Sequence, residues 1–293
     1  MQTSPSKLTG PRVLAACLAV ILLVALPMGC QSTANIDTSA MSFSPQPLVG
    51  KIVWNDLSTE DPDAARRFYG GLFGWTFDRS TGLDGSLYLL ARSGRVYVAG
   101  IVEVHSHSDR WLPYASVEDV DVSVAKARAA GAKVPVAGRN VSLGRIAVIV
   151  DPQGGVIGLA RSHIGDPDDA TTRPGAGRVV WTELLANNPV AATDFYETVI
   201  GYSAQTVERR GGRYTLLSGG GTNRAGIMQN PSDEAMPLWL TYFGVDDLEA
   251  TVSRVEVLGG KVVLPPSPRL REGSMAVITD PSGALLALQK VSP

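Results

Sequence analysis

The sequence predicts an α+β fold: two tandem domains, each built from two βαβββ modules whose strands form a curved eight-stranded cup. The first observation is an internal repeat, because the segment 50–75 (GKIVWNDLSTEDPDAARRFYGGLFGW) recurs as 177–202 (GRVVWTELLANNPVAATDFYETVIGY) at an offset of 127 residues. A repeat of that length is a duplicated domain and not a solenoid unit. The second is the order of strand and helix patterns, which both copies share. The third is the length of 293 residues, which suits two domains.

Each repeat opens with a strand and a helix. A β-branched run predicts the first strand over 51–57. Asp61-Pro62, repeated as Asn188-Pro189, has the residue types of an N-cap and a first helical position, because the side-chain oxygen caps free amides and proline loses nothing there. Apolar residues at helical spacing then lead to a C-cap at Gly74. Strand-like runs follow at 75–77, 87–91 and 95–104.

The second half of each repeat has the same order. A strand at 114–117 leads into a helix that starts at Glu118-Asp119 and ends at Gly131, and strands at 133–136, 145–150 and 156–160 complete the module. The last two strands join through the DPQG sequence at 151–154, whose twin is DPSG at 280–283, and these residues suit a type I turn. We therefore place domain 1 at 49–163, a linker at 164–176 and domain 2 at 177–291.

The composition is that of an ordinary globular protein, with 44% hydrophobic and 18% charged residues. The net charge is −2 and no basic run stands out, so we expect no nucleic-acid surface, which would need clustered Lys and Arg. Both cysteines, Cys17 and Cys30, precede the repeats, which predicts a folded part without disulfide or thiolate chemistry. The three histidines, His105, His107 and His163, leave little for a metal enzyme built mainly on imidazole.

The N-terminus has the pattern of a secretory signal peptide. Two basic residues precede an apolar run over 13–28, which is short for a membrane span. The run ends in LPMGC, which resembles the lipobox of bacterial lipoproteins, so we expect a signal peptide over 1–30 and lipidation of Cys30. Residues 31–48 are rich in Ser, Thr, Ala and Pro and predict a flexible tether.

Other interpretations of the N-terminus stay open. The LAAC sequence ending at Cys17 matches the lipobox better letter by letter, but almost no apolar segment precedes it. An ordinary cleaved signal or an uncleaved anchor is the remaining option. Gln31 after the cysteine is compatible with outer-membrane sorting if the host is Gram-negative. The sequence thus predicts an exported protein, attached to the cell envelope through an N-terminal lipid.

The repeated motifs resemble the vicinal oxygen chelate superfamily, which includes glyoxalases, extradiol dioxygenases and bleomycin-binding proteins. The resemblance rests on a first strand, a helix with the pattern D/N-P-x-x-A-x-x-F-Y, a following G-W/Y and a D-P-x-G turn before the last strand. It covers about 240 residues, and spacing and order match twice. Membership implies that the two modules of each domain pair into one cup, but the fold alone does not define the chemistry.

The resemblance also predicts where metal ligands would stand. The first-strand positions carry Trp54 and Trp181, the fifth-strand positions Leu112 and Leu240, the final-strand positions Gly158 and Ala287, and the fourth positions fall near Gly100 and Gly226. None of these side chains binds a divalent cation, which needs several carboxylates, imidazoles or thiolates. We therefore expect no metal and no cofactor. His105 and His107 would share a face if they lay on a strand, and a solvated loop is the alternative.

Two carboxylates and their neighbours are the candidate site residues. Trp54 and Asp56 alternate on one face of the first strand, as do Trp181 and Glu183 in the second repeat. A carboxylate beside an indole in the cup would be desolvated, would have a raised pKa and could act as a general acid or base. The alternative is that the carboxylates bond to backbone or lie in water, and that the tryptophans only fill the core.

Two tyrosines of the first repeat have counterparts in the second, at spacings within one residue of the 127-residue offset. They are Tyr88 with Tyr214 and Tyr114 with Tyr242. On strands they could offer hydroxyls to a ligand, or pack with only their tips at the rim. Arg145, Arg269 and Arg271 lie at or just before the seventh strand of their domains; they could attract an anion, or belong to a solvated face.

These observations favour binding over catalysis. The leading hypothesis is an envelope lipoprotein that binds a small, partly apolar molecule in its cups without a metal. One rival is an enzyme. It could be a metal-dependent lyase or dioxygenase whose metal ligands stand at other sequence positions than those given above, or a metal-free acid–base catalyst using Asp56 or Glu183. Another is a structural or interaction module with filled cups. A monomer is compatible with both domains lying in one chain.

Overall fold

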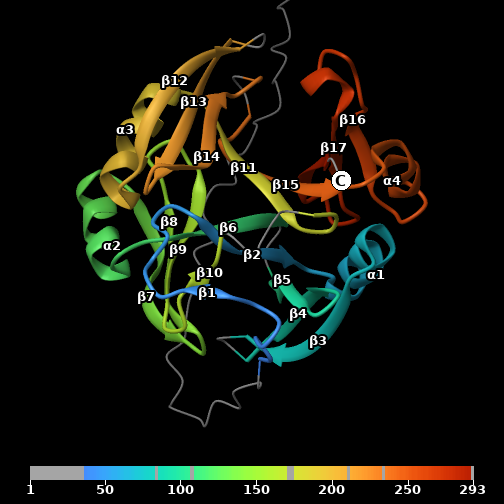
Figure 1. Ribbon diagram of the computed structural model, residues 1–293, viewed down its shortest axis with the longest axis horizontal. Coiled ribbons are helices and arrows are strands. Elements are labelled where there is room, and N and C mark those ends of the chain that lie inside the picture. Colours follow the sequence, from blue (N-terminus) through green and yellow to red (C-terminus); the bar gives the residue numbers. More distant parts are fainter. Residues whose placement is uncertain are drawn as a thin grey trace, which may run out of the picture.

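The computed structural model describes residues 36–82, 85–105, 109–169, 175–209, 212–232 and 235–291. The expected signal peptide, with Cys17 and Cys30, lies outside the described residues. Within them, two eight-stranded sheets and four helices make up the two domains (Figure 1). None of the helices in these ranges is long and apolar enough to cross a membrane.

Domain 1 is one mixed sheet with two helices. Its elements are β2 (Ile52–Thr59), α1 (Pro62–Phe73), β3 (Thr76–Thr81), β4 (Leu87–Ser93), β5 (Val96–Glu103), β6 (Arg110–Ser116), α2 (Val120–Ala129), β7 (Lys133–Val141), β8 (Gly144–Val150) and β9 (Val156–Ser162). The strand order is β3-β4-β5-β2-β6-β9-β8-β7. Each module therefore contributes four adjacent strands, and the two modules join where β2 pairs antiparallel with β6.

Domain 2 repeats this order. Its elements are β11 (Val179–Ala186), α3 (Pro189–Ile200), β12 (Ser203–Arg209), β13 (Gly212–Gly219), β14 (Thr222–Gln229), β15 (Leu238–Val245), α4 (Leu248–Val255), β16 (Lys261–Leu264), the short 3-10 helix η1 (Arg271–Gly273), β17 (Met275–Thr279) and β18 (Leu285–Lys290). The strand order is β12-β13-β14-β11-β15-β18-β17-β16. The predicted α+β fold with four βαβββ modules is confirmed, and both sheets are open.

The residues predicted to cap the helices occupy those positions in the structure. The Asp61 side chain accepts a hydrogen bond from Ala64 N at 2.8 Å, and Asn188 caps α3 in the same way. Helix α1 ends at Gly74, whose φ of 70° lies in the left-handed region that glycine tolerates. Strand β6 starts four residues earlier than predicted, because Pro113 interrupts the sequence pattern but does not break the strand.

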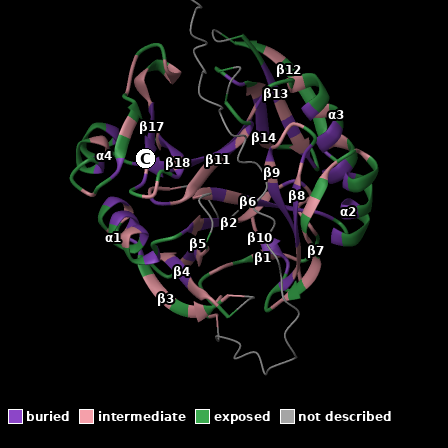
Figure 2. Cartoon of the chain, turned by 180° about the vertical axis from the view of Figure 1, so that it is seen from behind, coloured by how far each residue is buried: buried purple, intermediate pink, exposed green. Residues whose placement is uncertain are grey.

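The main apolar cores extend across both domains. The first module packs against the fourth, with Phe68 of α1 and Phe243 of β15 in one buried cluster. The second module packs against the third, with Val124 of α2 and Tyr196 of α3 in another. Accordingly, α1 lies beside α4 and α2 beside α3 (Figure 1). Figure 2 shows buried residues along the central strands and exposed residues along the outer helices.

Two of the repeated motifs bond to each other across the domains. The Tyr69 hydroxyl, from the F-Y pair of domain 1, donates to Asp280 Oδ2 in the D-P-x-G turn of domain 2 at 2.9 Å. Tyr196 of domain 2 donates to Asp151 Oδ2 of domain 1, also at 2.9 Å. A buried tryptophan indole donates to each of these tyrosine hydroxyls. The motif residues therefore form a reciprocal lock between the domains.

The segment before domain 1 pairs with the segment between the domains. Strand β1 (Phe43–Ser44) is antiparallel to β10 (Asp166–Pro167). The buried Asp166 carboxylate accepts hydrogen bonds from Leu48 N at 2.6 Å and from the Ser116 hydroxyl at 2.5 Å. The end of the expected tether and the start of the expected linker thus hold each other against domain 1.

The faces of the sheets turned away from these shared cores form the two cups. Cup 1 is the face of β2, β4, β5, β6, β8 and β9 on which Trp54, Tyr114 and Val148 lie. Cup 2 is the corresponding face of domain 2, on which Trp181, Leu240 and Tyr242 lie.

Candidate functional site

Cup 1 brings together all four of the domain 1 residues predicted for the site. Trp54 Nε1 donates to Asp56 Oδ1 at 2.8 Å and to the Tyr88 hydroxyl at 3.0 Å, and that hydroxyl donates to the same Oδ1 at 2.7 Å. Tyr114 lies opposite Trp54 in the register of β6 and β2. Asp56 therefore bonds to side chains of the cup, and not to backbone as the alternative supposed.

The environment of Asp56 changes its acidity. Burial, which disfavours the charged carboxylate, raises its pKa above the ordinary value of 3.8. Contacts with Tyr88, Trp54 and Tyr114 act in the opposite direction, because their N–H and O–H groups stabilise the charge. Trp54 and Tyr88 both donate to Oδ1, and Tyr114 also hydrogen-bonds to the carboxylate. An ionised carboxylate has about four acceptor lone pairs, so Asp56 can accept a further hydrogen bond from another molecule.

Cup 2 brings together the four equivalent residues. Trp181 Nε1 donates to the Tyr214 hydroxyl at 2.7 Å, which donates to Glu183 Oε2 at 2.8 Å. The Tyr242 hydroxyl donates to Glu183 Oε1. Burial and the adjacent Glu183 charge raise the pKa values of both tyrosines, so their hydroxyls stay protonated as donors.

A fifth residue, Arg271, enters cup 2. Its Nη2 lies 3.0 Å from Glu183 Oε2, and its guanidinium lies 4.6 Å from the centre of the Tyr242 ring. Glu183 is only 2% exposed, whereas Asp56 is 9% exposed. The negative charge of the Glu183 carboxylate is thus balanced by Arg271 of the same chain, and the group is shielded from solvent.

The difference between the cups arises in the strand before the seventh. In domain 1, β7 and β8 form a hairpin in which Val141 pairs with Gly144. In domain 2, β16 ends at Leu264 and the prolines of the sequence PPSP at 265–268 follow, which lack N–H groups for a sheet ladder. The chain leaves the sheet and returns over the cup at Arg271, whose guanidinium pairs with Glu183 and does not belong to a purely solvated face. The proline cluster was the available signal for this departure.

Comparisons with known proteins agree with the geometry. The sequence pattern of the Glyoxalase/Bleomycin resistance protein/Dioxygenase superfamily matches residues 178–288, and that of a glyoxalase-like domain matches residues 52–160. The chain belongs to this superfamily. It is 34% identical over 250 residues to a Mycobacterium tuberculosis protein named "Putative glyoxylase CFP32", covering 82% of this chain and 94% of that protein. It is 30% identical to the anthracycline biosynthesis protein DnrV of Streptomyces peucetius, with 80% and 91% covered.

Solved structures share the fold. The Mn(II)-bound glyoxalase from Novosphingobium aromaticivorans has a TM-score of 0.58 at 17% identity, covering 84% of this chain and 83% of that one. A catechol 2,3-dioxygenase has a TM-score of 0.53 at 15% identity, with 83% and 93% covered. At this level of identity, the likeness concerns the fold alone.

Members of the superfamily that use a metal ion would need cation ligands in the cups. At Gly158 an added Cβ would lie 2.1 Å from the Tyr114 ring, and at Gly100 it would lie 2.0 Å from the Tyr88 hydroxyl. Tyr214 fills the space over Gly226 in the same way. Tyrosines thus occupy the space that ligand side chains at these positions would need. No three His, Cys, Asp or Glu side chains of the described residues come together as a metal ligand set. The residues of the cups do not fit a divalent cation.

The remaining candidates lie away from the cups. Arg145 pairs with Asp121 of α2 at 2.8 Å, and Arg269 is exposed to solvent. His105 is exposed, and His107 lies outside the described residues.

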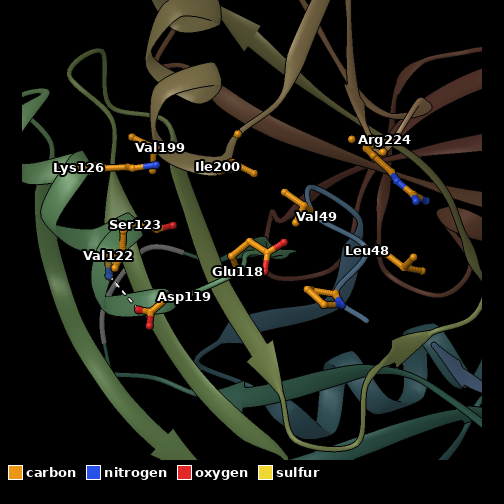
Figure 3. A pocket seen from close by; sticks show the side chains of 14 residues that line it. Leu48, Val49, Glu118, Asp119, Val122, Ser123, Lys126, Val199, Ile200 and Arg224 are labelled. Atoms are coloured by element: carbon orange, nitrogen blue, oxygen red, sulfur yellow. Dashed lines mark hydrogen bonds between the residues drawn. The ribbon is translucent and has the colours of Figure 1, made fainter. Parts of the chain in front are cut away.

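A groove of about 530 Å³ lies between α2, the end of α3 and residues 47–49 (Figure 3). It is lined by Glu118, Lys126, Ile200 and Arg224 among others, and by none of the predicted site residues. This groove is therefore separate from the candidate chemistry of the cups.

Proposed function

We propose that the protein binds a small, partly apolar molecule in cup 1 without a metal ion. The observation that carries this proposal is Asp56: a nearly buried carboxylate that accepts hydrogen bonds from Trp54, Tyr88 and Tyr114 and has acceptor capacity left for a ligand. Trp54 and Tyr88 are half-buried, so part of each ring is available for contact. Leu112 and Val148 add apolar walls. Such a site combines an apolar lining with a few oriented polar groups, as ligand sites do.

A binding screen tests the proposal. The full chain, purified in detergent without chelators, is titrated with small aromatic compounds while the indole N–H resonance of Trp54 is followed by NMR. A ligand of cup 1 shifts this resonance, and Asp56→Asn weakens binding. Asp78→Asn is the matched control, because Asp78 pairs with Arg92 on an exposed part of the first sheet.

Two outcomes would reject the proposal. A stoichiometric metal in the purified protein, lost together with ligand binding on chelation, would show that a cation site exists after all. If no compound shifts the Trp54 resonance, the cups act as packed structural elements, which favours an interaction module.

The raised pKa of Asp56 supports a second candidate, metal-free acid–base catalysis. A carboxyl group that stays protonated above its usual range is a better proton donor near neutral pH. A ligand found in the screen that is converted to product by the wild type, and only bound by Asp56→Asn, would establish catalysis.

We propose that the N-terminus anchors the protein to the cell envelope through a lipid on Cys30. The support is the sequence pattern alone. In bacteria fed a radioactive fatty acid, the wild type should become labelled and Cys30→Ala should not; labelling that persists in Cys30→Ala and disappears in Cys17→Ala would assign the anchor to Cys17.

A further inference from the structure

The two cups share an indole, two tyrosines and a carboxylate, and cup 2 adds two arginines, with Arg271 at the carboxylate and the Arg209 guanidinium 4.0 Å from the centre of the Tyr214 ring. Tyr88 donates to Asp56 at 2.7 Å, and Tyr214 donates to Glu183 at 2.8 Å. The first-strand indole donates to the tyrosine hydroxyl in both cups. The fifth-strand tyrosine lies opposite the indole in both registers. Cup 2 can therefore be read as a second state of the arrangement in cup 1.

In cup 2 this arrangement holds a cation supplied by the chain itself. Arg271 Nη2 pairs with Glu183 Oε2 at 3.0 Å, and the guanidinium lies 4.6 Å from the centre of the Tyr242 ring, within the range of a cation–π interaction. The backbone at Arg271 and Glu272 has φ values of 46° and 58°, the left-handed conformation that disfavours residues other than glycine. Arg271 therefore reaches cup 2 from a backbone conformation that residues other than glycine rarely adopt.

In cup 1 the chain supplies no equivalent cation. The β7–β8 hairpin stays in the sheet, and Arg145 turns away to Asp121 and to the carbonyl oxygen of Gly138. Among the described residues, no basic side chain forms an ion pair with Asp56 or contributes to its pKa shift. Arg110 lies on the same face of β6, one register row beyond Asp56, and it too is absent from those contributions.

We infer that cup 1 takes a primary amine or guanidinium group of an apolar, aromatic ligand, in the place that the Arg271 side chain takes in cup 2. The cation would pair with the Asp56 carboxylate and lie over the Tyr114 ring, while the rest of the ligand contacts Leu112 and Val148. A partly desolvated cation gains from both the carboxylate and the ring face. This inference rests on the proposed binding role of cup 1 and names its ligand class.

Calorimetric titration of the full chain with two matched probes tests it. The probes are benzylammonium, which carries the cation, and benzyl alcohol, which has the same ring and no charge. We expect one benzylammonium site in the wild type, two in Arg271→Ala, none in Asp56→Asn, and one in the variant with both substitutions. Binding to cup 1 should be at least about tenfold weaker for benzyl alcohol and for Asp56→Asn. The indole resonances of Trp54 and Trp181 identify the occupied cup.

The outcomes separate the inference from the proposed function. Equal affinities of the two probes at Trp54, unchanged by Asp56→Asn, would overturn the cation inference and leave binding in cup 1 intact. A single site in Arg271→Ala, at Trp181, with no site in the wild type would show that only cup 2 accepts cations, and would also overturn it. If neither probe shifts Trp54, the inference fails, and the wider screen decides separately whether cup 1 binds any compound. Asp56→Asn retains the wild-type loop at 271, so its result does not depend on how Arg271→Ala folds.

Discussion

Replacing Tyr196 by Phe removes one hydroxyl from the lock between the domains. That hydroxyl donates to Asp151 Oδ2 and accepts from Trp239 Nε1, both at 2.9 Å, and all three residues are buried. Oδ1 of Asp151 already accepts from three backbone amides of its turn, so the carboxylate cannot rotate to find another partner. The substitution leaves a carboxylate oxygen and an indole N–H buried without partners.

The magnitude follows from these two losses. A hydrogen bond to a charged group contributes about 1.5–3 kcal/mol, and an unpaired buried donor costs about 1–3 kcal/mol. We therefore expect Tyr196→Phe to lower the free energy of unfolding by about 3–5 kcal/mol. Urea denaturation followed by tryptophan fluorescence and circular dichroism measures this difference. A loss of 3 kcal/mol corresponds to a fall in Tm of roughly 6–12 °C for a chain of this kind.

Tyr97→Phe is the matched control. Its hydroxyl donates to Asp78 Oδ2 at 3.1 Å, but Asp78 is 39% exposed and keeps its ion pair with Arg92. The same chemical change should therefore cost less than about 1 kcal/mol. If Tyr196→Phe is as stable as Tyr97→Phe, the reasoning that this contact locks the domains is refuted.

Three further predictions concern the cup and the N-terminal segment. Gly100→Ala should weaken binding in cup 1 by about tenfold or more, because its Cβ would lie 2.0 Å from the Tyr88 hydroxyl and 2.2 Å from Asp56 Oδ1; Gly175→Ala, which meets nothing within 4 Å, is the calorimetric control. The affinity for benzylammonium should fall as the pH is lowered, because the carboxylate of Asp56 must be ionised to bind it. The midpoint of this fall should lie above pH 3.8, since burial raises the pKa of Asp56. A pH-independent affinity would contradict this. Asp166→Ala should speed chymotrypsin cleavage at Phe43, seen by mass spectrometry, because the Leu48 N–H loses its acceptor; unchanged cleavage would show that β1 is held by other contacts.

The fold was accessible from the sequence because each module carries independent local signals. The caps at Asp61 and Asn188, the helical spacing and the D-P-x-G turns each predicted an element, and the repeat allowed every assignment to be made twice. Strand alternation also placed Trp54 and Asp56 on one face, where the structure has them. What local patterns predict is therefore which residues share a face.

Contacts between residues that lie far apart in the sequence could not be predicted in the same way. The lock between Tyr69 and Asp280 joins residues 211 positions apart, and nothing in either motif states that it bonds to the other domain. Arg271 reaches cup 2 because the chain leaves the sheet after Leu264, and no periodicity describes the path of an irregular loop. Sequence reasoning found the shared residues of the two cups and named Arg271, but it did not place Arg271 at the carboxylate of cup 2.

The reciprocal lock has a consequence for what the duplication allows. Each half of the chain contains both kinds of partner, a tyrosine on its first helix and an aspartate in its last turn. Two separate copies of one half would satisfy the same bonds by twofold symmetry, but their cups would then be identical by necessity. Joining the halves in one polypeptide removes that constraint. One half is free to keep a built-in occupant such as Arg271, while the other stays available to a molecule from outside.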